Sequence, residues 1–241
     1  MTRRSPLATL RRMHGDRQGL ALLEFALAFP VLLAIGGWGV ELSNLSLTSL
    51  KVSQYALNLA DNASRVGMDS GNGGVSLIRE ADVNDVFFGT RQEGKAIGIG
   101  DNARVTLSSL ELIKQSYDTG NNPPIRIHWQ RCFGVKKGAG FDSSYGTTKP
   151  TDGITDKQAD QGTTVTGGMG DTNFKVQPPS GTATMFVEIN YFYKPIFGSL
   201  FVKPQIIHQT ASLVVRDNRD LTKIYNLSPE ASRATCDLYT A

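Results

Sequence analysis

Residues 20–40, LALLEFALAFPVLLAIGGWGV, are apolar at every position except Glu24. A helix of these 21 residues would be about 30 Å long, which matches the hydrocarbon thickness of a bilayer. Trp38 falls near the end of the run, where membrane proteins commonly place an interfacial aromatic residue. The run therefore predicts one transmembrane helix.

The segment before this run is strongly basic. It carries arginines at positions 3, 4, 11, 12 and 17 against a single acid, Asp16, so it contributes +4 to a formal net charge of +3. By the positive-inside rule, this leader should stay in the cytoplasm, and everything after Val40 should lie outside it. A nucleic-acid-binding protein would spread its basic residues over a folded face, so that class is disfavoured.

An ordinary secretory signal is the main alternative for the N-terminal segment. It fits less well, because the apolar run exceeds the usual h-region of about 7 to 15 residues and no Ala-x-Ala site follows it. Glu24 also has two interpretations. It could snorkel to the interface from its position near the cytoplasmic end, or it could pair with a cation.

Beyond the apolar run, residues recur at alternating spacings of three and four, which is the seam of an amphipathic helix. The seam consists of Leu42, Leu45, Ser49, Val52, Ala56, Leu59, Ala63 and Val66. One helix over 20–66 would be about 70 Å long, with Pro30 as a position for a kink and Gly67 as a stop. We expect its last three turns to pack on the chain's own domain, and the part within and just above the membrane to pack on a partner.

Four later segments alternate as strands do, at 105–114, 125–132, 184–193 and 206–216. They predict an α+β domain in which the long helix covers a small antiparallel sheet with long irregular loops. Residues 69–100 are predicted as loop with a short helix near 75–88. Residues 134–180, with nine glycines and eight threonines, are predicted as solvated loop with little core. Within them the acids at 152, 156 and 160 lack the order of a calcium hand.

The segment 195–204 between the last two predicted strands is unusually apolar for a turn. Its large apolar residues are Ile196, Phe197, Leu200 and Phe201. Such a turn either folds back on its own domain or contacts a partner or a membrane interface.

The only two cysteines, Cys132 and Cys236, predict one disulfide if the domain is exported. A metal site is disfavoured, because His14, His128 and His208 stand in no zinc-binding spacing. No Walker loop, G-x-S-x-G elbow or G-x-G-x-x-G motif is present. We therefore expect a structural protein without cofactor or metal, and not an enzyme.

The junction Arg17-Gln18-Gly19 followed by Leu20-Ala21-Leu22-Leu23-Glu24-Phe25 resembles a prepilin peptidase site. The chain resembles TadE/TadG-like pilus assembly proteins, whose C-terminal outline is matched by residues 189–195, the apolar turn and residues 211–216. The resemblance implies cleavage between Gly19 and Leu20, and pairing of the new Leu20 amine of one subunit with Glu24 of another, beside Phe25.

The resemblance further implies a pseudopilin or minor pilin of a tight-adherence (Flp-type) pilus in the bacterial inner membrane. Its parts would be a cytoplasmic leader at 1–19, the membrane and amphipathic helix at 20–66, and a periplasmic domain at 67–241. The implied partners are the prepilin peptidase and other pilins, with no nucleic acid. The alternative is an unprocessed, membrane-anchored periplasmic binding or adhesive domain.

Overall fold

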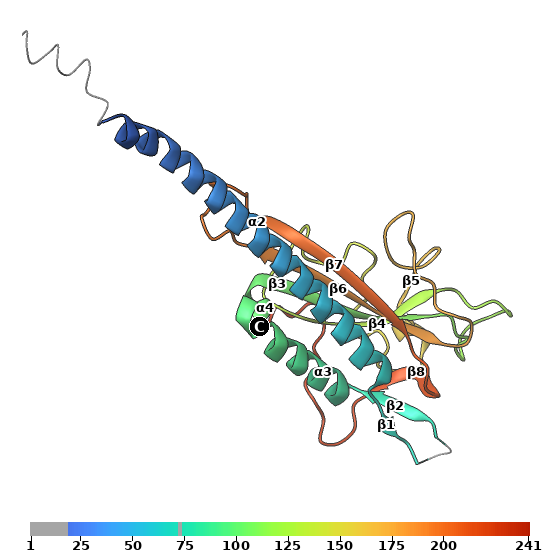
Figure 1. Ribbon diagram of the computed structural model, residues 1–241. Helices are drawn as coiled ribbons and strands as arrows, with labels where there is room; N and C mark the ends of the chain where they lie inside the picture. The colour runs from blue at the N-terminus through green and yellow to red at the C-terminus, as the bar shows by residue number, and fades with distance from the viewer. Residues whose placement is uncertain (1–18, 72–73) are drawn as a thin grey trace, which may run out of the picture. The chain divides into compact units, whose positions relative to one another are not determined.

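The computed structural model describes residues 19–71 and 74–241. It divides the chain into two compact units, one comprising the chain up to Leu45 with Pro195–Lys203, the other Ser46–Lys194 with Pro204–Ala241. The arginines of the predicted leader lie outside the described residues. Figure 1 shows the long helix α2 and the sheets of the larger unit.

Helix α2, Leu20–Arg65, confirms the predicted long helix. It passes through Pro30 without interruption, and its first half is apolar enough and long enough to cross a membrane. In the larger unit, its second half buries one seam, made of Val52, Ala56, Leu59, Ala60 and Ala63. The prediction that the last turns pack on the chain's own domain is therefore confirmed.

Five antiparallel strands form the main sheet, in the order β5-β4-β3-β6-β7. They are β3 (Ala103–Glu111), β4 (Arg126–Phe133), β5 (Thr163–Thr164), β6 (Ala183–Tyr193) and β7 (Gln205–Val214). The four predicted strands are confirmed, with ends that move by at most three residues. Every residue of β3 and β4 is buried, which means that both faces of the sheet are covered.

Helices cover one face of the main sheet. Phe133 of β4 packs edge-on against Phe87 of α3, Glu80–Glu93, with ring centroids 5.0 Å apart. The amide of Gln209 in β7 donates to Ser49 of α2 at 3.3 Å. Figure 1 shows the second half of α2 and α3 beside the main sheet. The same face holds Arg131, whose Nε donates to the buried Glu80 carboxylate at 2.7 Å.

The glycine-rich segment 134–180, here called the cover segment, is an irregular loop whose residues are mostly exposed or half-buried, as expected, but it also covers the opposite face of the main sheet. Met169 from this segment is buried against Leu110, Ile127 and Phe186, and Tyr145 packs edge-on against Phe186 at 5.6 Å. The segment contains the short 3-10 helix η2 (Gln158–Asp160) and β5. The segment adds little core of its own, and its few apolar side chains suffice because the sheet supplies the rest.

Glycine lets this segment approach the sheet closely. All nine of its glycines have positive φ. A Cβ at Gly162 would lie 2.0 Å from the carbonyl oxygen of Ile127, and one at Gly168 would lie 2.0 Å from that of Val176. Backbone packs on backbone at both points, so a side chain at Gly162 would push the segment off β4, and one at Gly168 would push it away from Val176 within the segment itself.

A second, three-stranded sheet was not predicted. It runs in the order β1-β2-β8, with β1 (Met68–Asp69), β2 (Ser76–Arg79) and β8 (Arg219–Tyr225), and β2 pairs with β8 in parallel. The helix expected near 75–88 therefore begins only at Glu80, after β2. Asp82 fixes that start, since its carboxylate accepts the backbone N–H of Arg79 at 2.9 Å. Helices η1 (Gly94–Ile97) and α4 (Ile99–Asn102) lead into β3.

Candidate functional site

The predicted cleavage junction lies at the first described residues. Gly19 and Leu20 are both exposed, and α2 begins at Leu20. The carbonyl of Gly19 accepts the backbone N–H of Leu23 at 3.1 Å. A Cβ at Gly19 would meet no atom within 4 Å, so in this structure a larger residue there would be tolerated. The fold itself therefore does not require glycine at this position.

Glu24 and Phe25 lie on the exposed first turns of α2. Phe25 stacks on Phe29, with ring centroids 5.2 Å apart. Within residues 19–71 and 74–241, the Glu24 carboxylate has no hydrogen bond or ion pair. The helix thus carries one acid without a described partner among exposed apolar side chains.

The apolar turn at Pro195–Lys203 joins β6 to β7 and belongs to the same unit as the first half of α2. Within this unit, Phe201 packs on the helix at Gly37, where an added Cβ would lie 2.8 Å from the Phe201 ring. Ile196, Phe197 and Leu200 stay exposed, at 57%, 45% and 75%. The turn therefore folds back on the helix and still presents an apolar surface.

Glu41 holds this turn, and the sequence analysis did not identify it. Its side-chain oxygens accept the backbone N–H groups of Ile196 at 3.2 Å and Phe197 at 3.0 Å. Glu41 is 0% exposed. The signal in the sequence was its place as the first acid after the apolar run, but nothing in the sequence paired it with a turn more than 150 residues away.

The predicted cysteine pair lies at disulfide distance, with the sulfurs of Cys132 and Cys236 2.09 Å apart. The pair ties the C-terminal tail to β4, and the backbone N–H of Cys132 also donates to Ala234 at 2.7 Å. Arg104 reinforces this attachment, because its guanidinium donates to the carbonyls of Leu238 at 2.8 Å and of Cys236. The disulfide and this arginine together fix the tail.

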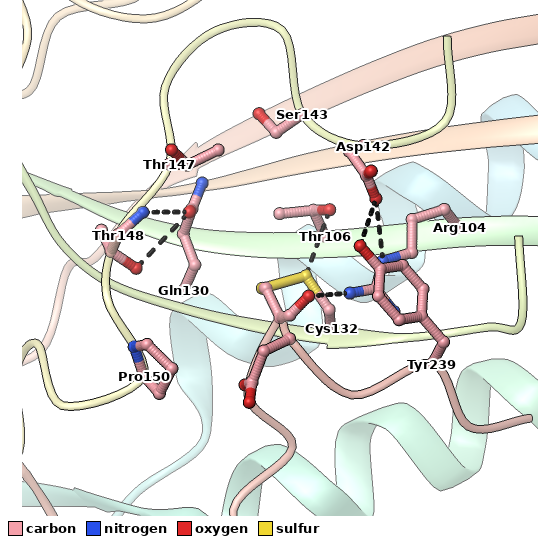
Figure 2. Close-up of a pocket in the computed structure, with 12 residues that line it drawn as sticks. Arg104, Thr106, Gln130, Cys132, Asp142, Ser143, Thr147, Thr148, Pro150 and Tyr239 are labelled. Atoms are coloured by element: carbon pink, nitrogen blue, oxygen red, sulfur yellow. Dashed lines mark hydrogen bonds and ion pairs between the residues drawn. A yellow bond between two sulfur atoms is a disulfide. The ribbon is translucent and has the colours of Figure 1, made fainter. Parts of the chain in front are cut away.

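A cavity of about 270 Å³ lies beside the disulfide, and Figure 2 shows residues that line it. Arg104 stacks on Tyr239 at 4.3 Å on one side of it, near Asp142. Burial lowers the pKa of Arg104 below its ordinary value, whereas Tyr239, Asp142 and Asp237 oppose that shift. On the other side, the Gln130 side chain donates to Gly146 O and accepts from Thr148 N. Arg104 thus bonds to the C-terminal tail, and Gln130 bonds to the cover segment. The cavity therefore lies where the tail and the cover segment meet on the sheet.

The two described histidines lie on the main sheet. His128 is fully buried, with Nδ1 3.0 Å from Glu111 Oε2, and Ser109 donates to the other oxygen of Glu111 at 2.7 Å. His208 Nε2 lies 2.9 Å from the Tyr145 hydroxyl.

Burial, and then the bond to Asp171, raises the pKa of the Tyr145 hydroxyl, so this hydroxyl stays protonated and donates to Asp171 at 2.8 Å. His128, by contrast, is fully buried, so solvent and substrate have no access to it.

Two of the three spaced acids of the cover segment accept hydrogen bonds within its turns. Asp152 is buried and accepts the backbone N–H of Lys149 at 2.7 Å, and Asp160 accepts the hydroxyl of Thr155. Asp156 is exposed. In the part of the chain that the structure describes, no group of three or more His, Cys, Asp or Glu residues could hold a metal ion.

Comparisons of this chain with protein-family models, with curated proteins and with solved structures each give no match.

Proposed function

We propose that this chain is a structural pseudopilin or minor pilin that takes part in assembling a tight-adherence pilus, as TadE/TadG-like proteins do. One observation carries the proposal. A single helix is apolar and exposed around its first half, while its second half buries a seam on an α+β domain. A subunit held in a bilayer by one end of a helix, with its folded domain at the other end, suits assembly by helix packing.

The first half of α2 needs an apolar environment. Twelve large apolar residues between Leu20 and Val40 are exposed. Covering each one fully is worth about 1.5 to 3 kcal/mol, so leaving all twelve in water is strongly unfavourable. A bilayer, and then other pilin helices, would supply that cover. The arginines of the leader favour a cytoplasmic N-terminus in the inner membrane.

The cysteine pair supports a periplasmic location for the domain. Disulfides persist in oxidising compartments and are rare in the cytosol. With the N-terminus inside and one crossing, the residues after Val40 reach the periplasm, where Cys132 and Cys236 would be oxidised. The topology inferred from charge and the chemistry inferred from the cysteines therefore agree.

Processing at Gly19 tests the proposal directly. We expect a prepilin peptidase to cut between Gly19 and Leu20, and the substitution Gly19→Val to block the cut. Intact-mass measurement on membrane fractions would then show a mature chain beginning at Leu20 for the wild type and a full chain for the variant. Gly15→Val is the matched control, because it places the same side chain in the same leader and keeps the junction.

Equal processing of Gly19→Val would rule out this cleavage. A wild-type chain that keeps Met1 would instead favour the unprocessed, membrane-anchored binding or adhesive domain.

Glu24 would take part in assembly. An acid in the middle of a membrane helix costs about 2.5 to 3.5 kcal/mol, and less near an end. The lack of a described partner for Glu24 supports pairing with a group from outside the chain, and the amine that cleavage creates on Leu20 of another subunit has the right charge.

The substitution Glu24→Gln separates pairing from snorkelling. Insertion, cleavage and domain folding should be unchanged, because an amide suits a membrane helix better than a carboxylate. Incorporation into the pilus should be lost. The measurement compares sheared pilus fractions and membrane levels of both chains, with piliation scored separately in case the protein starts assembly without entering the fibre. Normal piliation and normal co-purification would remove the pairing role.

A further inference from the structure

The apolar turn at Pro195–Lys203 lies beside the outer end of the apolar run. Phe201 packs on Gly37, and Trp38, the next residue, is itself exposed. Phe197 packs edge-on against Phe201, with ring centroids 5.7 Å apart. The exposed apolar residues of the turn therefore adjoin the exposed apolar surface of the helix within one unit.

The position of this contact along the helix sets its depth in a bilayer. Gly37 comes 17 residues after Leu20, which is about 25 Å along a helix that rises 1.5 Å per residue. The hydrocarbon core of a bilayer is about 30 Å thick. If the run begins at the cytoplasmic surface, then Gly37 and the turn packed on it lie at the outer interface.

The polar groups of the turn are suited to this depth. A bilayer cannot satisfy free backbone N–H groups. Two of those in the turn, on Ile196 and Phe197, donate to the Glu41 carboxylate. Glu41 is itself fully buried, so its charge does not face the lipid or the solvent. An acid next to the membrane and the N–H groups of an apolar turn are therefore satisfied together.

We propose that the turn is a second membrane contact, which inserts Ile196, Phe197 and Leu200 into the outer interfacial region of the bilayer that α2 spans. The proposal rests on the membrane span in the proposed function. Lys194 and Lys203 are exposed at the two ends of the turn in sequence, where their ammonium groups can reach anionic lipid headgroups. Continuity with the helix and these flanking charges favour lipid as the occupant.

A probe at Leu200 tests the contact in the full chain. Cys132 and Cys236 are paired, so Leu200→Cys introduces one free thiol for an environment-sensitive fluorophore such as nitrobenzoxadiazole. The labelled chain is reconstituted into vesicles of phosphatidylcholine and phosphatidylglycerol. We expect a blue-shifted emission, and stronger quenching by lipids with a nitroxide near the headgroup than by lipids with one deep in the acyl chain.

Two further positions are matched controls. Phe174→Cys places the fluorophore on the cover segment at a residue that is 81% exposed, and it should show neither the shift nor the quenching. Leu27→Cys places the fluorophore within the apolar run and should be quenched most by the deep nitroxide. The Leu27 probe reports the membrane span independently of the turn.

The outcomes separate the inference from the function on which it rests. Quenching at position 27 without quenching at position 200 would overturn the inference and leave the span intact. Quenching at neither position would overturn both. A blue shift at position 200 that lipid nitroxides do not quench, and that grows with the ratio of protein to lipid, would assign the turn to a second copy of this chain and overturn the lipid contact.

Discussion

The two halves of α2 share one continuous backbone and differ in how their apolar residues are arranged. In the first half these residues surround the helix and are exposed, as at Leu22 and Leu32. In the second half one seam is buried, with Val52 and Leu59 fully buried, whereas apolar residues off the seam such as Leu57 stay exposed. The comparison shows that the spacing of apolar residues along a helix determines what can bury them. An apolar seam can be buried by one domain, whereas a helix that is apolar on all sides needs a lipid bilayer or several partner helices.

The largest expected effect concerns the domain to which the second half belongs. The double substitution Cys132→Ser and Cys236→Ser opens a loop with a sequence separation of 104 residues. For a loop of that size the chain-entropy model gives about 4.7 kcal/mol. Urea unfolding in detergent, followed by near-ultraviolet circular dichroism, should show this loss, and membrane association through the first half should not change.

A reductant provides the control for the disulfide. It should destabilise the wild-type domain by a similar amount and leave the double variant unaffected. If the double variant were as stable as the oxidised wild type, then the tail would be held by its hydrogen bonds alone.

The next effect compares two leucines within the second half of α2. Leu59 is fully buried, so Leu59→Ala should lower the free energy of unfolding by about 2 to 5 kcal/mol. Leu57 is exposed two residues away, and Leu57→Ala should change it by less than about 0.5 kcal/mol. Leu32→Ala in the first half should also leave domain unfolding unchanged. Equal losses for Leu59→Ala and Leu32→Ala would abolish the distinction between the halves.

The smallest expected effect concerns Gly37, the position near the end of the first half of α2 where Phe201 of the apolar turn packs. Gly37→Ala adds a Cβ 2.8 Å from Phe201, which should displace the turn, while the gain in helix propensity of about 1 kcal/mol offsets part of the cost. Hydrogen exchange of the Ile196 and Phe197 amides should become faster. Gly36→Ala is the control, because its Cβ would meet nothing within 4 Å. The contact with Gly37 would be unimportant if both variants exchanged alike.

Periodicity predicted the parts of the fold that repeat. The helix seam and the alternation of Met185, Val187 and Ile189 located α2 and β6, because burial on one face leaves a regular trace in the sequence. Strands β2 and β8 escaped prediction. They are short, of four and seven residues, and their pairing is set by tertiary contacts such as those of Arg219 with the carbonyls of Ala63 and Ser64.

The candidate site was predictable only where its residues form one local motif or where the sequence leaves a single choice of partner. The junction at Gly19 and the acid at Glu24 form one local motif, and the two cysteines had no other partners to choose from. Glu41 could not be linked to Ile196 by any local rule, since the pairing depends on where the β6–β7 turn folds back. The apolar turn itself was identified, but which of its residues pack and which stay exposed required the structure.

The cover segment has a practical consequence for labelling the protein with an inserted epitope. It resembles a flexible linker by composition, yet an epitope inserted at Gly162 would separate it from β4, since the carbonyl oxygen of Ile127 lies 2.0 Å from any added Cβ there. Gly138, in the same segment, has no atom within 4 Å of an added Cβ. An insertion beside Gly138 would project into solvent, as exposed loop tips allow, and would report the subunit without disturbing its fold.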